Sequence, residues 1–287
     1  MFDVIVIGGA NIDIKAKAGQ HYRLGTSNPG MVTTTAGGVG RNIAHNLARL
    51  GVNVALVSAV GNDAHGEALM HATQSAGVAI NLVQREPVAT GTYVAMLDDS
   101  GELVSAVSDM RILDRLTPDV VHQYLSHIQA ARFIIADCNL PLDTLHALAK
   151  LCGDKLAVEP VSVQKSRKLM EVLKQSPVRV ATPNMDQIDA LLATRDIEKA
   201  CNMLHGHGLQ NVVVHAGSEG AFTWDGSSLA HVPPSGTGIV VDVTGAGDAA
   251  MAGLVYGLLQ GDSLETAAIL GQDMAARVIA STHSTLE

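Results

Sequence analysis

The stretch Val240-Val241-Asp242-Val243-Thr244-Gly245-Ala246-Gly247-Asp248 joins a run of β-branched residues to a glycine turn. It predicts a strand, then a turn, then a helix over Asp248–Leu259, where apolar residues recur three and four positions apart. Glycines let backbone amides approach an anion, and a helix N-terminus adds unpaired N–H groups. We therefore expect the amides of Gly245, Ala246 and Gly247 to bind a phosphoryl group and stabilise it during transfer.

Asp248 follows this predicted anion site directly. A carboxylate there can accept the proton of an attacking hydroxyl, which is the one proton transfer that phosphorylation of an alcohol requires. A second interpretation stays open, because acidic residues after tight turns also cap helices. A third interpretation is the dinucleotide fingerprint of oxidoreductases, which the spacing Gly245-x-Gly247-x-x-Ala250 matches. That fingerprint needs a following strand with an acidic residue. The pattern predicts a helix over Ser263–Ser281 instead, which argues against that class.

Short β-branched runs alternate with longer amphipathic segments along the rest of the chain. This alternation is typical of an α/β fold with a mostly parallel sheet flanked by helices, in which ligands bind where strands end. The predicted strands are Val4–Ile7, Val54–Val57, Phe133–Ala136, Leu156–Val158, Val178–Ala181 and Val212–Val214. The further predicted helices are Asn42–Leu50, Asp63–Ser75, Pro118–Ile128, Leu142–Leu151 and Asp196–His205.

One region departs from this alternation. Thr90–Leu97 and Glu102–Val107 are separated only by Asp98-Asp99-Ser100-Gly101, which is typical of a hairpin. Ile12–Thr35 can supply companion strands, so residues 12–35 and 90–107 together predict a small sheet that projects from the main body. Such a sheet can act as a lid over a substrate.

Composition limits the classes of function. The 287 residues are 47% hydrophobic, which suits a single domain over 1–287, and the net charge of -9 disfavours nucleic-acid and anionic-membrane partners. No apolar run approaches the ~20 residues that span a bilayer. Cys138, Cys152 and Cys201 lack zinc-site or disulfide spacing, and residues 1–7 lack the basic region of a signal peptide. We therefore expect a cytoplasmic protein with a small-molecule substrate.

A second motif, Gly37-Gly38-Val39-Gly40-Arg41-Asn42-Ile43-Ala44, precedes Leu47-Ala48-Arg49-Leu50-Gly51. With the glycine turn before Asp248, it resembles the two signatures of the ribokinase-like (PfkB) carbohydrate kinases, and the similarity extends over nearly the whole chain. The resemblance implies a ribokinase-like fold with a β-sheet lid. It also implies ATP and Mg²⁺ as cofactors, K⁺ at backbone carbonyls near Asp242 as a further option, and a homodimer formed through the lid.

The resemblance further implies residue roles. Asp13 would hold sugar hydroxyls, since one carboxylate can accept two of them, and small glycines would let the sugar ring approach the backbone. Without the resemblance, Asp13 and the glycines would be ordinary turn residues. The implied sugar-binding residues are Asn11, Asp13, Gly37, Gly38 and Asn42, and the implied nucleotide-binding residues are Asn184, Gly217, Gly220, Thr244 and Gln272.

Several further stretches resemble the pseudouridine kinases within this family. They are Ser27-Asn28-Pro29-Gly30, Ser108-Asp109-Met110, Ala136-Asp137-Cys138-Asn139, and Pro160-Val161-Ser162 with Lys165. Polar side chains can read the N–H and C=O groups of a base, so Asp109, Asn139 and Lys165 are the candidates. The implied reaction is ATP-dependent phosphorylation of the 5′-hydroxyl of a ribosyl substrate, pseudouridine to pseudouridine 5′-phosphate, with ribose, adenosine and guanosine or inosine as alternative acceptors. A non-catalytic nucleoside-binding protein is the other alternative.

The chain departs from the family pattern at two acidic positions. Gln187 stands where family members carry a glutamate linked to magnesium, so the metal ligands are unknown, with Asp186 as one candidate. A neutral amide binds Mg²⁺ more weakly than a carboxylate does. Glu159 stands where pseudouridine kinases have aspartate before Pro-Val-Ser, which keeps the charge.

Overall fold

Strand β1 (Val4–Ile7) is fully buried, and each of its residues is at most 1% exposed. The computed structural model describes residues 1–236, 238 and 240–287. β1 pairs in parallel with β4 (Val54–Val57) on one side and with β9 (Phe133–Asp137) on the other. An uninterrupted apolar strand is expected there, because helices cover both faces of such a sheet.

The described residues form an eight-stranded main sheet in the order β14-β13-β12-β11-β10-β9-β1-β4. Its strands run parallel from β12 to β4, while β13 and β14 are antiparallel at the other edge. The remaining strands of this sheet are β10 (Leu156–Glu159), β11 (Val178–Ala181), β12 (Leu209–His215), β13 (Ala221–Trp224) and β14 (Leu229–Val232). Their carboxyl ends therefore meet at one edge of the main body.

Helices cover both faces of the main sheet. Successive β1 side chains alternate between the faces, so Val4 and Val6 belong to one apolar cluster and Ile5 and Ile7 to the other. The first cluster includes α1 (Val39–Arg49), α2 (Ala64–Ser75), α9 (Ala246–Gln260) and α10 (Leu264–Ile279). The second includes α3 (Pro118–Gln123), α4 (Leu125–Ala130), α5 (Leu142–Cys152), α6 (Val163–Leu173), α7 (Met185–Leu192) and α8 (Ile197–Gly206).

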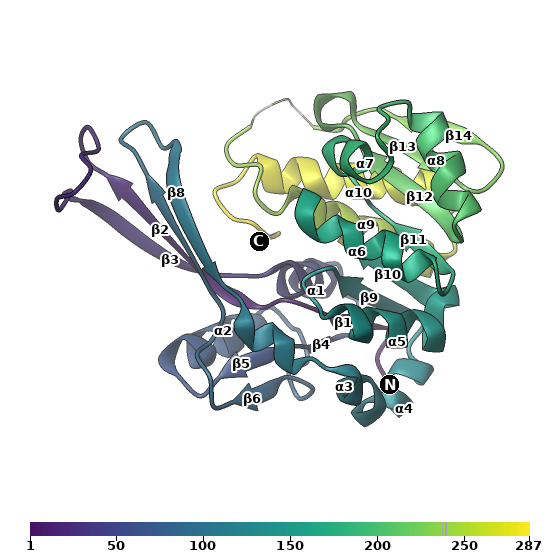
Figure 1. Cartoon of the computed structure of the whole chain (residues 1–287), viewed down its shortest axis with the longest axis horizontal. Helices are drawn as coiled ribbons and strands as arrows, with labels where there is room; N and C mark the ends of the chain where they lie inside the picture. Colours follow the sequence, from purple (N-terminus) through teal and green to yellow (C-terminus); the bar gives the residue numbers. More distant parts are fainter. Residues whose placement is uncertain (237, 239) are drawn as a thin grey trace.

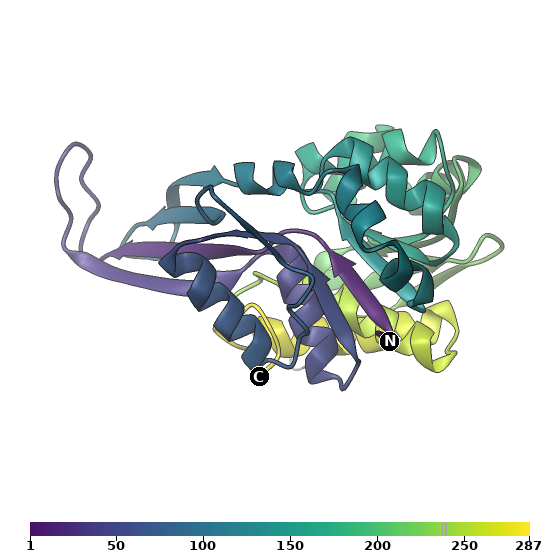
Figure 2. The same ribbon diagram turned by 90° about the horizontal axis from the view of Figure 1, so that it is seen from below.

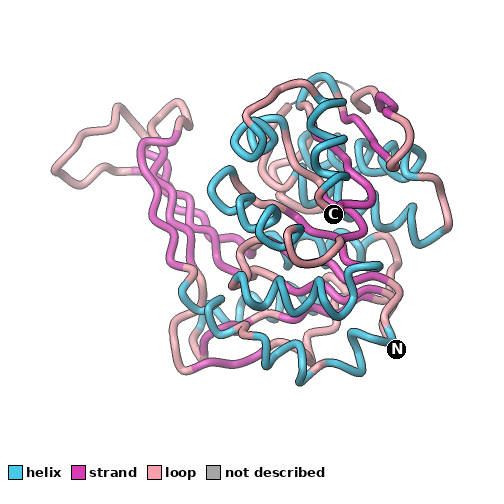
Figure 3. Tube along the Cα trace, turned by 45° about the vertical axis from the view of Figure 1, so that its right-hand side comes forward, coloured by secondary structure: helices cyan, strands magenta, loops and turns pink. Residues whose placement is uncertain are grey.

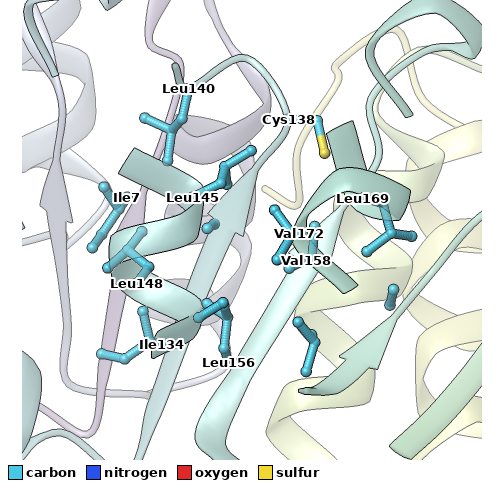
Figure 4. Close-up of a cluster of buried hydrophobic side chains, with 14 of the residues drawn as sticks. Ile7, Ile134, Cys138, Leu140, Leu145, Leu148, Leu156, Val158, Leu169 and Val172 are labelled. Carbon is cyan, nitrogen blue, oxygen red and sulfur yellow. The ribbon is translucent and has the colours of Figure 1, made fainter. Parts of the chain in front are cut away.

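Figure 4 shows how the second cluster is built. Leu148 of α5 lies over Ile134, Leu145 lies one turn earlier on the same helix, and Val172 of α6 lies close to Val158 of the neighbouring strand. These side chains are at most 1% exposed, so the layers are held together by full burial of aliphatic groups.

A second, four-stranded sheet stands away from this body (Figures 1 and 2). Its order is β3-β2-β7-β8, with β2 (Asn11–Ala18), β3 (Gly30–Gly37), β7 (Thr92–Leu97) and β8 (Leu103–Asp109). Figure 3 shows these strands as a twisted ribbon beside the helical body. The α/β fold with a mostly parallel sheet and a small projecting sheet is therefore confirmed, while the single domain over 1–287 stays a prediction.

Glycines bring the start of α1 against the end of β1. Gly38 has φ of 100°, and a Cβ on Gly40 would lie 2.9 Å from the Gly8 backbone. The amide of Arg41 donates to the Gly9 carbonyl at 3.0 Å. The glycines Gly38 and Gly40 are therefore needed for close packing between the end of β1 and the start of α1, whatever further role they have in the site.

Most predicted elements are confirmed with shifts of a few residues at their ends, but two predictions need correction. Residues 240–244 are not a strand: they form a loop in which the Val241 amide donates to Ile279 O, and Val243 is 67% exposed. The helix predicted over Pro118–Ile128 is interrupted at Tyr124. The sequence analysis also missed α6, α7, β13, β14, the short strands β5 (Ala59–Gly61) and β6 (Gln84–Glu86), and the 3₁₀ turns Arg111–Arg115, Gly153–Lys155 and Gly217–Glu219.

No helix in the described part of the chain combines the length and apolar character that crossing a membrane requires.

We expect Gly40→Ala to lower the free energy of unfolding by about 1–3 kcal/mol, because its methyl group would overpack the junction with Gly8. Gly206→Ala is the matched control, since a Cβ there meets nothing within 4 Å. Urea denaturation of both variants measures the difference. Equal stabilities would show that the junction tolerates a side chain.

Candidate active site

A cleft of about 1110 Å³ opens at the carboxyl ends of β1, β9, β10, β11 and β12. Residues of β2, β7 and β8 also line it, so the small sheet forms one of its walls. The start of α9 forms another, and this is where the glycine turn lies. The cleft is therefore bounded by the elements that the sequence analysis singled out.

Most of the predicted site residues line this one cleft, although they come from distant parts of the chain. Gly37, Asp109 and Asp186 do not line it. Those that do are Asn11, Asp13, Gly38, Asn42, Asn139, Lys165, Asn184, Gln187, Gly217, Gly220, Thr244, Gly245, Ala246, Gly247, Asp248 and Gln272.

Asp248 lies in the first turn of α9 and is 8% exposed. Its pKa is raised to about 7, chiefly by burial and also by the negative charges of Asp137 and Asp13. A hydrogen bond opposes them: Asn42 Nδ2 donates to Asp248 Oδ2 at 2.9 Å. A carboxyl whose pKa lies near neutrality is suited to accept a proton and release it again.

The glycine turn brings backbone amides to the same wall of the cleft. Gly245 has φ of 82°, a conformation that favours glycine, and it precedes the first residue of a 15-residue helix. A Cβ on Gly245 would lie 2.1 Å from Ser284 O, so a side chain is excluded there by contact as well. The first amides of α9 lie at the positive end of its dipole and can bind an anion beside Asp248.

Asp13 lies across the cleft on β2. Asn11 Nδ2 donates to its Oδ1 at 2.6 Å, while burial raises the pKa of the Asp13 carboxyl against the opposing charges of Lys15 and Arg41. Gly37 does not reach the cleft, but a Cβ there would lie 2.1 Å from Asp13 Oδ2. Gly37 therefore provides the space in which this carboxylate sits.

Asn139 and Lys165 form a polar pair at the end of β9. Lys165 Nζ donates to Asn139 Oδ1, and burial lowers the pKa of Lys165 while the nearby Asp137 carboxylate raises it. Asp137 itself is fully buried and accepts hydrogen bonds from the amides of Gly9, Gly40 and Asn139 at 2.7, 2.9 and 2.9 Å. Two of the three predicted base-reading residues are thus brought together.

Asp109, the third, is held elsewhere. Its carboxylate accepts hydrogen bonds from Arg111 Nε and Nη2 at 2.9 and 2.6 Å on the protein surface. These bonds lower the pKa of Asp109 to about 2. The neighbours Ser108 and Met110 line the cleft in its place.

The position of the missing family glutamate is occupied by a capping residue. Gln187 Oε1 accepts from the Asn184 amide at 3.0 Å, and Asn184 Oδ1 accepts from the Gln187 amide at 2.9 Å, which is a capping box at the start of α7. Asp186 points away and lies 3.4 Å from Arg195. Within residues 1–236, 238 and 240–287, no group of three His, Cys, Asp or Glu side chains could hold a metal.

Several further polar residues line the cleft although they were not predicted as site residues. Lys15 Nζ forms an ion pair of 2.9 Å with Asp242, which links the small sheet to the loop before the glycine turn. Glu159 accepts a hydrogen bond from Thr182 Oγ1, and burial raises its pKa to about 8. His215 has a buried Nε2 without a partner in the described residues, and burial lowers its pKa to about 4. Of these residues, only Lys15 could have been assigned to the site from the strand pattern, because the alternation of side chains along a strand places it on the same face as Asn11 and Asp13.

The model of the pfkB family carbohydrate kinases matches residues 1–286. The chain belongs to this family. It is 37% identical over 257 residues to a pseudouridine kinase of Escherichia coli, covering 88% of this chain and 82% of the relative. The structure resembles a carbohydrate kinase from Agrobacterium tumefaciens, with a TM-score of 0.86 and 33% identity over 99% of this chain and 93% of that one. It also resembles an Arabidopsis thaliana ribokinase solved with ribose and ATP, with a TM-score of 0.87 and 22% identity over 98% and 94% of the two chains.

The family resemblance read from the two motifs and the ribokinase-like fold are thus confirmed. PfkB kinases transfer a phosphoryl group from ATP to a sugar or nucleoside, so this chain is a sugar or nucleoside kinase.

We expect the unliganded kinase to lose stability between about pH 5 and about pH 8, because the pKa values of Asp248 and Glu159 are raised to about 7 and about 8 in the folded state. Stability from a carboxyl with a raised folded pKa is complete below its unfolded pKa and is lost as pH rises through the folded value. Asp248→Asn is neutral throughout, so it should raise the Tm more at pH ~8 than at pH ~5. The exposed Asp154→Asn is the control. An equal rise in Tm at both pH values would contradict the idea that ionisation of the buried Asp248 carboxyl destabilises the protein.

Proposed function

We propose that this kinase phosphorylates the 5′-hydroxyl of pseudouridine, giving pseudouridine 5′-phosphate. The observation that carries the proposal is the position of Asp248, a carboxyl with a pKa of about 7, directly beside the glycine turn in a cleft that also contains Asp13. This arrangement suits in-line transfer to an alcohol, which needs a base, an anion site and a fixed acceptor. The 37% identity to a pseudouridine kinase supports the choice of acceptor.

In the proposed reaction, Asp248 accepts the proton of the 5′-hydroxyl as that oxygen attacks the terminal phosphorus of ATP, and the bond from this phosphorus to the bridging oxygen breaks to release ADP. The amides of Gly245, Ala246 and Gly247 stabilise the negative charge on the transferred group. Asp13, held by Asn11, accepts hydrogen bonds from the ribose hydroxyls and so fixes the position of the attacking oxygen. Gly38 and Asn42 also line the cleft and complete the proposed sugar site.

The pair Asn139 and Lys165 supports a pyrimidine base with carbonyl groups. Lys165 Nζ occupies Asn139 Oδ1, and the Asn139 side-chain amide also donates toward Asp137, so the remaining hydrogens of Lys165 and Asn139 are the groups that can donate to a base. Donors recognise carbonyl oxygens, of which uracil has two and adenine has none. This favours pseudouridine over adenosine, with ribose and guanosine or inosine as the remaining alternatives. Asp109 is left out of the proposed base site because Arg111 holds it at the surface.

We propose that ATP binds along Asn184, Gly217, Gly220, Thr244 and Gln272, which line the cleft beyond the glycine turn. Mg²⁺ binds through one or two carboxylates together with phosphates and waters, and it neutralises phosphate charge when bound. Glu159 and Asp242 line the cleft and fit this requirement, whereas Gln187 is occupied as a helix cap.

The proposal also includes a homodimer and a location in the cytoplasm. The edge strands β3 and β8 of the small sheet expose Val32 and Val107 to 66% and 69%, which supports a homodimer formed through that sheet. Cys138, Cys152 and Cys201 are free and buried, which is consistent with the reducing cytoplasm.

Asp248→Asn should lower kcat by about 10² to 10⁴-fold and leave the Kd for the nucleoside nearly unchanged, because only proton transfer is removed. An ATP-coupled assay with pseudouridine, uridine, ribose, adenosine and inosine measures both acceptor choice and rate. Asp154→Asn, outside the cleft, is the control. Normal turnover of Asp248→Asn would remove it from the mechanism, and a preference for another acceptor would reject pseudouridine.

Gln187→Glu should keep the capping box, since glutamate also serves in it, and should add a carboxylate to the cleft. We expect the Mg²⁺ concentration for half-maximal rate to fall about 3- to 10-fold. Gln175→Glu, at an exposed position, controls for the change in net charge. An unchanged Mg²⁺ curve would separate this position from the metal.

A further inference from the structure

A buried segment lies behind the glycine turn, on the side away from the cleft. Leu286 is 5% exposed, and its amide donates to Asn46 Oδ1 at 2.8 Å. Its carbonyl lies 2.9 Å from His45 Nε2. Since Ser284 O touches the Gly245 backbone, residues 284–286 bridge helix α1 and the glycine turn.

Arg41 continues these contacts through α1. It is 4% exposed, and its Nη2 lies 3.1 Å from His45 Nδ1 while its Nη1 lies 3.2 Å from Asn42 Oδ1. A guanidinium can only donate, so His45 Nδ1 must accept and His45 Nε2 must carry the proton given to the Leu286 carbonyl. Burial and the charge of Arg41 lower the pKa of His45 to about 4, which keeps this imidazole neutral.

The same rule fixes the amide of Asn42. Its oxygen must face the Arg41 guanidinium, so its nitrogen faces Asp248 and donates to Oδ2 at 2.9 Å. A half-turn of the amide would set two donors together at Arg41 and two acceptors together at Asp248. Arg41 thereby selects the one orientation in which Asn42 stabilises the ionised carboxylate.

We propose that Arg41, held by His45 and the Leu286 carbonyl, is a positioning residue that orients the Asn42 amide toward the catalytic base Asp248. Arg41 and His45 do not line the cleft, so they act through Asn42 rather than on the substrate. The inference deepens the proposed function, because it rests on Asp248 being the base.

The groups around Asp248 explain why its orientation needs support. Asp13 from β2 and Asp137 from β9 carry carboxyls whose charge disfavours ionisation of Asp248, and Asp248 in turn disfavours ionisation of Glu159 from β10. Asn42 from α1 supplies the hydrogen bond that favours it. A buried arginine whose Nε has no partner in the described residues is costly, and fixing this hydrogen bond is a function that offsets the cost.

The test follows the titration of the Asp248 carboxyl by carbon-13 NMR in the full, unliganded chain, with the resonance assigned by its loss in Asp248→Asn. In Arg41→Met the pKa of Asp248 should rise by about one pH unit, because the variant removes a nearby positive charge and also leaves the Asn42 amide free to turn. His45→Phe keeps the charge of Arg41 but removes its acceptor, so it should shift the titration in the same direction by less. Arg49→Met, on the exposed side of the same helix, is the matched control and should leave it unchanged.

The pH profile of kcat gives a second readout. With a base pKa one unit higher, Arg41→Met should be about fivefold slower at pH ~7 and recover as pH rises, whereas a merely structural defect would slow it at every pH. If the wild type transfers no phosphate, the proposed function fails, and the titration still decides the positioning role. An Asp248 titration unchanged in both Arg41→Met and His45→Phe overturns the inference. If circular dichroism shows Arg41→Met unfolded, His45→Phe decides alone.

Discussion

The buried carboxylate of Asp137 joins the three segments from which the site is built. It accepts hydrogen bonds from Gly9 at the end of β1, Gly40 at the start of α1 and Asn139 after β9. A Cβ on Gly8 would lie 2.2 Å from Asp137 Oδ2, so the segments meet only because glycine stands there. Losing one of these three donors would weaken the compensation of a carboxylate that is fully buried in the core. The strand that carries the proposed sugar-binding residues, the helix that carries Asn42 and the proposed base-reading pair are all positioned relative to this carboxylate.

The cleft concentrates acidic groups that burial and mutual repulsion disfavour. Asp13, Glu159 and Asp248 all have raised pKa values, and none of them forms an ion pair in the described residues. Such a site is poor for the stability of the free protein but suited to catalysis, since a substrate proton, a cation or ligand hydrogen bonds can relieve the penalty. The glycine turn supplies the opposite partial charge at the same wall, so the site can receive a phosphoryl group and a proton side by side.

The sequence predicted the parallel strands well because a strand buried on both faces is uniformly apolar, as in Val4–Ile7. It predicted the glycine turn and Asp248 because both lie within a few residues of each other. The valines before that turn were misread as a strand because a β-branched run was assumed to be buried, while Val243 is largely exposed. Contacts across the chain could not be foreseen: Asn42 meets Asp248 over 206 positions and Lys15 meets Asp242 over 227. The capping role of Gln187 was missed for a different reason. The resemblance to the family raised the question of why a glutamate is absent at this position, and not what the glutamine does there.

The central claim is that the acceptor hydroxyl lies between the Asp248 carboxylate and a phosphoryl group held by the glycine turn. A crystal structure with pseudouridine and a non-hydrolysable ATP analogue tests it most directly. The account predicts the 5′-oxygen within about 3 Å of an Asp248 oxygen and the γ-phosphate on the amides of Gly245 to Gly247. A nucleoside bound with its base against Asp248, or a γ-phosphate outside the turn, would contradict it.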